Sequence, residues 1–309
     1  MKNVSVGGQA VMEGVMMKTL RHMSVAVRKN NKKIVTKSEK LLPPRNALLA
    51  RLYTMPFTRG AFNLYDITLL GIRTLIWSAQ QNGEEEEKIS NKEVFWMLFV
   101  SLLITLVIFL WLPYMLTGWL GFGEVSNPIL FNGVDAIIKM VFFIGYVLAI
   151  SMFDDIKRLF QYHGAEHKAV YCFEHNLPLN VKNVQSFSTK HPRCGTSFLM
   201  LVIIISIGVF VFLPIALSAW LPGFVSMPWY AQKGILFTLR ILCIPFIAGI
   251  SYELLKIGGK FHENPFMKIL IYPGILMQYL TTKEPFDDQV EVAIVAIKKV
   301  LKQEGINAR

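Results

Sequence analysis

The chain has 309 residues, of which 53% are hydrophobic, and its mean hydropathy is +0.43. Soluble domains usually contain about 45–50% apolar residues, so the apolar fraction of this chain is above the usual range, and the excess is concentrated in blocks. The 32 Lys and Arg residues outnumber the 21 Asp and Glu residues, which gives a net charge of +11. No nucleic-acid-binding motif accompanies these basic residues, and we expect no nucleic-acid partner. The three cysteines do not form a disulfide framework.

Residues 1–93 are predicted to form a cytosolic N-terminal region with a β-hairpin and amphipathic helices. The hairpin is predicted from two alternating runs, Ser24–Lys29 and Lys33–Lys37, on either side of Asn30-Asn31. Glycines 7, 8 and 14 near the start permit close approach or unusual backbone angles. Glu13 lies among them, and the sequence leaves open whether it is partly buried or an ordinary surface acid.

Helical periodicity follows over Asn46–Met55 and Arg59–Gln81, with a break at Pro56. The apolar positions of the second segment repeat every three to four residues, which is typical of a helix with one apolar face. Such helices either lie along the membrane surface or pack on the cytosolic domain. The sequence leaves both arrangements open.

Four apolar blocks follow and predict a transmembrane region over residues 94–255. Each is long enough, alone or with its flanks, for a bilayer core of about 30 Å. A fully buried soluble helix is the alternative, but four such blocks in one chain are hard to bury in any other way. The blocks are Val94–Pro113, Phe131–Phe153, Phe198–Leu213 and Ile235–Leu255.

The positive charges alternate between the segments that connect these blocks. Residues 1–93 contain fifteen Lys and Arg, residues 114–130 none, residues 154–197 six, residues 214–234 one, and the tail from 256 onward eight. Positively charged loops stay on the cytoplasmic side of a membrane. We therefore expect both termini and the segment 154–197 in the cytosol. The net charge then reflects topology and contact with anionic lipid.

Residues 256–309 are predicted to form a cytosolic C-terminal tail. Its first part, Phe266–Leu280, is apolar but short and is broken by Pro273-Gly274, so we expect an interfacial or re-entrant segment. Its second part, Asp287–Leu301, is an amphipathic helix with an expected Asp cap. This helix would be a docking surface for membrane protein partners if the chain is not an enzyme.

The residues His163-Gly-Ala-Glu166-His167 spell H-x-x-E-H inside the segment 154–197. Positions i and i+4 share one face of a helix, and i+3 lies beside them. Two imidazoles and a carboxylate can therefore converge on one point, as in inverted zinc peptidases. The pattern predicts a divalent metal, most simply zinc, with Glu166 as the general base that activates a water.

A metal site needs at least one further ligand, and the nearest candidates are His191 and Cys194, spaced H-x-x-C. Both ends of the segment join membrane helices, so the two motifs can meet at the membrane surface. Glu174 and Glu253 are other candidate ligands. A closed structural site is an alternative, as is a histidine pair that only forms hydrogen bonds. A further alternative makes Cys194 a nucleophile with a neighbouring histidine as base.

Four charged residues lie within the apolar blocks. Glu253 is at the cytosolic end of its block, and the other three are Asp135, Lys139 and Arg240. Asp135 can pair with either cation. Charges within a membrane are candidate functional residues, and a transporter or channel is the function they would indicate. Placement near the membrane surface would instead let these side chains reach the headgroups.

Four motifs together resemble the YqhQ-like family of bacterial membrane proteins. They are GGQAVMEGVMM near the start, FQYHGAEHKAV at 160–170, HPRCGTSF at 191–198 and EPFDDQVEVAI at 284–294. The resemblance covers nearly the whole chain and implies a multi-pass bacterial membrane protein of unknown function, sometimes described as a metal-dependent enzyme. His163, Glu166, His167, His191 and Cys194 occupy motif positions, and the resemblance assigns them no catalytic role.

We therefore expect a mainly α polytopic membrane protein. About four transmembrane helices should support a cytosolic layer that contains a small β-hairpin element. The leading functional hypothesis is a metal-dependent hydrolase at the cytosolic membrane face, acting on a membrane-associated substrate. The alternatives are a non-enzymatic scaffold for partner proteins with a structural His/Cys site and, less favoured, a transporter.

Overall fold

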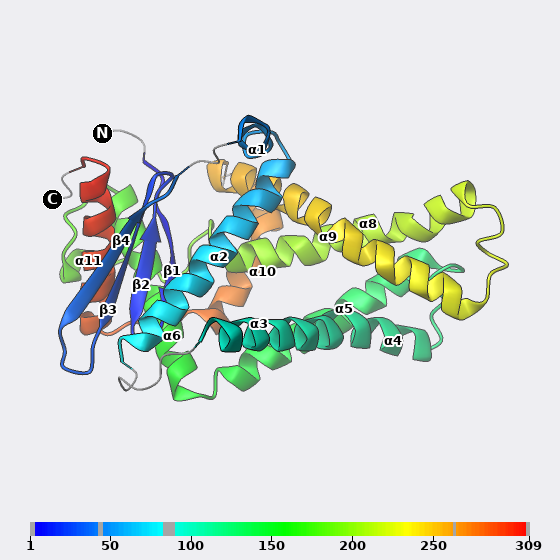
Figure 1. The fold of residues 1–309 in the computed structure, drawn as a ribbon, viewed down its shortest axis with the longest axis horizontal. Helices are drawn as coiled ribbons and strands as arrows, with labels where there is room; N and C mark the ends of the chain where they lie inside the picture. The colour runs from blue at the N-terminus through cyan, green and yellow to red at the C-terminus, as the bar shows by residue number, and fades with distance from the viewer. Residues whose placement is uncertain (1–3, 43–45, 83–89, 262–263, 307–309) are drawn as a thin grey trace.

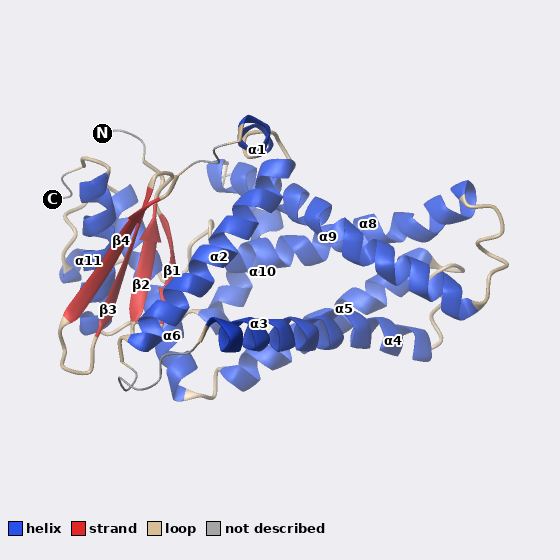
Figure 2. Cartoon of the chain, viewed as in Figure 1, coloured by secondary structure: helices blue, strands red, loops and turns tan. Residues whose placement is uncertain are grey.

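The computed structural model describes residues 4–42, 46–82, 90–261 and 264–306. A layered domain of strands and helices lies at one end of the long axis, and apolar helices extend from it to the other end (Figures 1 and 2). The N- and C-termini both lie at the end that carries the layered domain (Figure 1). Four candidate membrane spans, an even number, separate them along the chain.

The strands form an antiparallel sheet in the order β1-β2-β3-β4. The predicted hairpin is confirmed as β3 (His22–Arg28) and β4 (Ile34–Lys40), with Val27 opposite Val35. The sequence analysis did not predict the first two strands, β1 (Gly7–Val11) and β2 (Gly14–Lys18). Their five-residue length and their glycines weaken the alternation by which a strand is recognised.

Helices cover both faces of the sheet. On one face α6 (Asp154–Glu174) and α11 (Asp287–Gln303) pack against Val15, Met17 and Ala26. On the other, α2 (Thr58–Gln80) places Leu70 against Met16 and Val25. Neighbouring strand residues point to opposite faces, so the nearly continuous apolar run in β2 is buried on both sides. A short helix, α7 (Val181–Gln185), completes the layer formed by α6 and α11.

Helix α2 also joins this domain to the apolar helices, and α1 (Ala47–Leu52) precedes it. Arg59 of α2 forms an ion pair with Glu253 of α9 (Trp229–Lys260), with Nε and Oε1 2.6 Å apart. Gly60 lies so close to α9 that a Cβ atom there would stand 2.9 Å from the Cα of Gly249. The alternative left open by the sequence is thereby resolved, since α2 packs on the sheet and on α9.

Among the residues that the structure describes, four helices are long and apolar enough to cross a membrane, as predicted. They span Lys92–Trp119, Pro128–Ile150, Gly195–Trp220 and Trp229–Gly258. The first combines α3 (Asn91–Leu106), the π-helical turn η1 (Val107–Trp111) and α4 (Leu112–Trp119); the second and third are α5 (Pro128–Ile150) and α8 (Gly195–Trp220).

Local chemistry sets where these helices begin. Ser90 caps α3 and forms a capping box with Glu93, and the side chain of Asn127 accepts a hydrogen bond at the start of α5. The wide turn η1 directly precedes Pro113. A proline ring clashes with the carbonyl four residues earlier in a regular helix, and a π-helical turn is one way to relieve that clash.

The C-terminal helices correct two details of the sequence analysis. Pro273 does not break the apolar segment, because α10 (Pro265–Thr281) continues through it. The N-cap of α11 is Phe286 rather than an aspartate, and its amide donates to Gln289. The aspartates of α11 therefore lie inside its first turn, where they still favour the positive end of the helix dipole.

Asp135, Lys139 and Arg240 form one buried network with Glu124 of the turn between α4 and α5. Arg240 donates to Asp135 at 3.0 Å and to Glu124 at 2.7 Å, while Lys139 donates to Asp135 at 2.5 Å. Both pairings considered for Asp135 are therefore present. Arg240 is 1% exposed and Lys139 is 9% exposed, so neither side chain extends to the headgroups. The two cations and two carboxylates balance in charge, which fits a role in fixing the helices together.

Candidate metal centre

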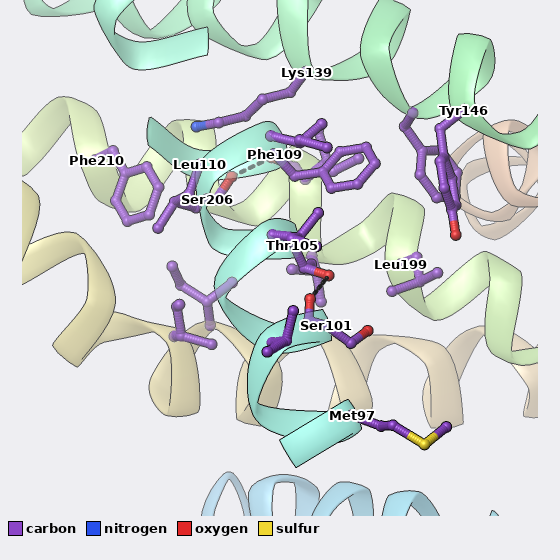
Figure 3. A pocket seen from close by; sticks show the side chains of 18 of the residues that line it. Met97, Ser101, Thr105, Phe109, Leu110, Lys139, Tyr146, Leu199, Ser206 and Phe210 are labelled. Carbon is purple, nitrogen blue, oxygen red and sulfur yellow. Dashed lines mark hydrogen bonds between the residues drawn. The ribbon is translucent and has the colours of Figure 1, made fainter. Parts of the chain in front are cut away.

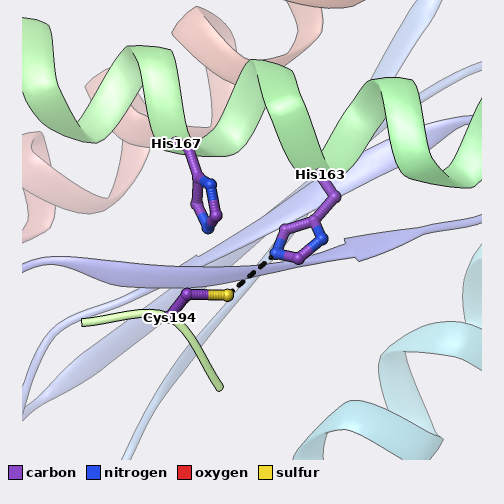
Figure 4. A group of neighbouring side chains, drawn as sticks. All are labelled: His163, His167 and Cys194. Carbon is purple, nitrogen blue, oxygen red and sulfur yellow. Dashed lines mark hydrogen bonds between the residues drawn. The ribbon is translucent and has the colours of Figure 1, made fainter. Parts of the chain in front are cut away.

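The regular spacing of one helical turn places two histidines on the same face of α6. Cys194 faces them from the start of α8 (Figure 4). One ligand atom from each of His163, His167 and Cys194 lies within 4.8 Å of the other two. Cys194 is the N-cap of α8, the helix whose first residue, Gly195, begins the third candidate span. The cluster therefore lies where the layered domain meets the apolar helices.

The donor set fits zinc or a similar divalent ion. Zinc binds nitrogen and thiolate sulfur at about 2.0–2.3 Å with tetrahedral angles, which places neighbouring ligand atoms about 3.3–3.8 Å apart. Cys194 Sγ lies 3.3 Å from His163 Nε2. Two imidazoles and one thiolate leave a fourth position for water or substrate, which is the arrangement of catalytic zinc sites.

Backbone carbonyls fix the orientation of both imidazoles. The Nδ1 atom of His163 lies 2.9 Å from the carbonyl of Thr281, and that of His167 lies 2.5 Å from the carbonyl of Thr189. A carbonyl can only accept, so Nδ1 carries the proton and Nε2 keeps its lone pair. Burial lowers the pKa of His167 and favours the neutral ring that a metal requires. Such outer contacts are typical of metal-binding histidines.

Glu166 lies beside the cluster and is 6% exposed. Its Oε2 is 3.5 Å from His167 Nε2. Burial raises the pKa of its carboxyl group, although His163, His191 and a hydrogen bond from the Gly8 amide partly oppose the shift. A Cβ atom on Gly8 would stand 2.7 Å from Glu166 Cγ, so the glycine is what lets β1 approach the carboxylate. A carboxylate with a raised pKa is suited to accept and return a proton near neutral pH.

His191 is placed near the cluster, but its ring nitrogens face other groups. Its Nε2 lies 3.4 Å from Glu174 Oε2, and its Nδ1 accepts from the Arg193 amide at 3.3 Å. The rings of His191 and His167 have centroids 5.7 Å apart. Burial lowers the pKa of His191 as well. Three of the four predicted metal ligands therefore converge, and His191 is next to them.

The other candidate ligands are engaged elsewhere. Glu174 forms an ion pair with Arg193 as well as its contact to His191. Glu253, which we considered as a ligand, instead pairs with Arg59 and accepts from the Phe57 amide. Both carboxylates are thus neutralised by arginines away from the cluster.

Two residues that the sequence analysis did not select hold the site together. The side chain of Gln278 accepts from the His191 amide at 2.7 Å and donates to the His191 carbonyl at 2.9 Å, which fixes the loop that carries Cys194. Gly164 lies so close to the chain after α10 that a Cβ atom there would stand 2.1 Å from the Lys283 carbonyl. A glutamine within an apolar segment is the signal that could have identified Gln278.

The sulfur of Cys194 receives further polar contacts. The Thr196 hydroxyl donates to it at 3.2 Å, and the Thr196 amide does so at 3.5 Å. Amides and hydroxyls at the start of a helix stabilise a thiolate. Arg193, the residue before Cys194, forms an ion pair with Glu174. These contacts suit a metal-binding thiolate and a nucleophilic one equally well.

A family model described as a protein of unknown function (DUF1385) matches residues 55–303, which include α6, the loop to α8 and all of α11. The chain belongs to this family. This DUF1385 protein is also 34% identical, over 97% of its length and 93% of the relative's, to the uncharacterized protein YqhQ of Bacillus subtilis (strain 168). No solved structure matches it. The family resemblance found in the sequence is thereby confirmed.

Proposed function

We propose that the protein is a metal-dependent hydrolase whose site lies at the membrane surface. The observation that carries this proposal is the convergence of His163 Nε2, His167 and Cys194 Sγ with a buried carboxylate beside them. The two histidines and the cysteine would hold a divalent ion, most simply zinc. Such an ion supplies Lewis-acid chemistry, which lowers the pKa of a water and polarises a carbonyl or phosphoryl oxygen.

The protein's own groups have distinct roles in this proposal. The carbonyls of Thr281 and Thr189 keep both imidazoles in the tautomer that presents Nε2 to the ion. Glu166 accepts a proton from the attacking water and returns it to the leaving group. The Gly8 amide holds that carboxylate in place. Burial of Glu166 keeps bulk water away from the proton being transferred.

Two measurements on the detergent-purified protein test this function. Elemental analysis should find about one divalent ion per chain, and the double substitution His163→Ala, His167→Ala should abolish it because too few ligands remain. Glu166→Gln should keep the ion and fold but fail to complement loss of the native protein, since a general base contributes about 10²–10⁴-fold in rate. Full complementation by Glu166→Gln with the ion retained would leave only a structural site.

A second candidate is a cysteine nucleophile without a metal. The 3.3 Å contact between Cys194 Sγ and His163 Nε2 is the geometry of a thiol and its base. Under this reading His167→Ala would spare much of the function, whereas the metal reading requires His167 as a ligand. A chelator would also leave the cysteine enzyme active. Together these two results separate the candidates.

We place the site on the cytosolic side of a bacterial plasma membrane. The charge asymmetry between alternate connecting segments supports this orientation. The apolar helices would then be in contact with lipid. If no ion is found and the substitution of Cys194 leaves function intact, the scaffold hypothesis takes precedence. Partner membrane proteins would then dock on the domain formed by the sheet, α6 and α11.

A further inference from the structure

A large apolar cavity lies among the candidate spans, apart from the metal centre. Its volume is about 980 Å³, and its walls come from α3, η1, α5, α8 and α9 (Figure 3). Ligand pockets usually measure about 300–1,000 Å³, so the cavity is at the upper end of this range. One wall is formed by α3, which is part of the candidate span Lys92–Trp119. This span is the most exposed of the four, because no residue in its most apolar stretch is buried. The cavity can therefore be entered from the surrounding lipid.

The lining is complementary to an uncharged hydrocarbon. Its single charged side chain, Lys139, is neutralised by Asp135 at 2.5 Å. The hydroxyls of Thr105 and Ser206 donate to carbonyls of their own helices, at 2.8 and 2.7 Å. The wall therefore presents no uncompensated charge, and these hydroxyls already have acceptors. A polar solute would lose its hydrogen bonds to water on entering such a cavity.

The cavity is deeper than half of the bilayer core on one wall and about half on another. On α8 its lining runs from Leu199 to Phe210, or about 16 Å of helix, and on α3 and η1 it runs from Trp96 to Leu110, or about 21 Å. These depths are about half to two-thirds of a hydrocarbon core of about 30 Å. The deep end adjoins the buried network, because Lys139 lines the cavity and Arg240 lies 4.6 Å from the centre of the Phe210 ring. A membrane-spanning peptide would need a deeper site.

The shallow end approaches the metal centre. Leu199 lies five residues after Cys194, or about 7 Å along the helix axis. Thr196 lies three residues before Leu199 and therefore on the same face of α8, the face that lines the cavity. Its hydroxyl contacts the Cys194 sulfur. A chain held in the cavity would thus have its head end at the proposed catalytic groups.

We propose that the cavity binds an acyl chain of a membrane lipid from the leaflet next to the layered domain, and that this lipid is the substrate class. The assignment of the lipid as substrate rests on the proposed function, because it links the lipid to the reaction at the metal centre. The binding of the acyl chain depends only on the cavity.

Two neighbouring isoleucines of α8 provide a matched test. Ile203 lines the cavity, whereas Ile204 is 36% exposed and is not part of the lining. The protein, reconstituted in phosphatidylcholine vesicles, is photolabelled with phosphatidylglycerol that carries a diazirine midway along one acyl chain. Peptide mapping should locate adducts on the cavity faces of α3, α5 and α8. Ile203→Trp should reduce them about tenfold, the loss expected when about two methylene groups are displaced from burial; Ile204→Trp should leave them unchanged.

Equal labelling of the two tryptophan variants, or adducts spread evenly over all lipid-facing residues, would overturn the proposal. So would cross-linking of the cavity to a protein instead of the lipid. Ile203→Trp should also fail to complement while Ile204→Trp complements; full complementation by both would reject the lipid as substrate. The His163→Ala, His167→Ala variant should label normally, so a failure of the metal chemistry is distinguished from a failure of lipid binding.

Discussion

Replacing Gly8 with alanine should disturb the metal centre from the sheet side. The added Cβ would stand 2.6 Å from the Met16 carbonyl oxygen, 2.7 Å from Glu166 Cγ and 3.0 Å from Glu166 Oε1. Carbon atoms in good contact are about 3.5–4.0 Å apart, so β1 or Glu166 must move by up to about 1 Å. Overpacking of this kind costs about 1–3 kcal/mol. Gly7 is the matched control, because a Cβ there meets nothing within 4 Å.

Gly7→Ala should be neutral or stabilise the protein by about 0.4–1 kcal/mol, since it reduces the freedom of the unfolded chain. The two variants should therefore differ by about 1–4 kcal/mol in the free energy of unfolding. Thermal unfolding in detergent measures this difference, and complementation reports whether Glu166 still functions. If Gly8→Ala unfolds at the same temperature as Gly7→Ala and complements fully, then Gly8 does not position Glu166.

Three other expectations follow from the buried charges and from the topology. Arg240→Met should destabilise the protein by about 3–5 kcal/mol, because it leaves two buried carboxylates without their shared cation; a change below about 1 kcal/mol in detergent unfolding would contradict this. Burial lowers the pKa of His167 and His191 below the usual 6.5, so the unfolded chain takes up more protons as pH falls below 6.5. The free energy of unfolding of the chelator-treated protein should then be highest above that pH and should fall by up to about 2.7 kcal/mol per pH unit below it. A free energy of unfolding that stays constant from pH ~8 to ~5 would show that the two rings are not held neutral. In intact cells, an impermeant thiol reagent should label a cysteine introduced at Gly123 but not one at Asn176; the reverse pattern would invert the topology.

Much of the architecture could be predicted because its signals are local. A span of lipid-facing helix needs about twenty apolar residues, and no tertiary contact changes that requirement, so all four candidate spans were identified from hydropathy. The hairpin of β3 and β4 was identified from alternation on either side of Asn30-Asn31. The short strands β1 and β2 were missed, since β2 is buried on both faces and therefore shows no alternation.

The candidate site also has a part that could be predicted from the sequence and a part that could not. Helix geometry alone places His163 and His167 on one face, so the H-x-x-E-H motif was sufficient to predict the pair. The sequence also determined that Cys194 and His191 lie near each other on one loop, but not which of them reaches the pair. Spacing along a chain carries no information about the direction of a side chain in a loop.

Only the tertiary structure decided that choice. Gln278, on a helix that is 87 residues away in sequence, fixes the backbone of His191, and Glu174 draws its ring away from the cluster. Cys194 is left at the start of α8, where its sulfur faces His163. The sequence thus determined the spans, the hairpin and the histidine pair, whose causes lie within a few residues. The third member of the His/Cys cluster, the approach of Gly8 to Glu166 and the cavity beside α8 depend on contacts between distant segments. These contacts are fixed only when the helices and the sheet pack together.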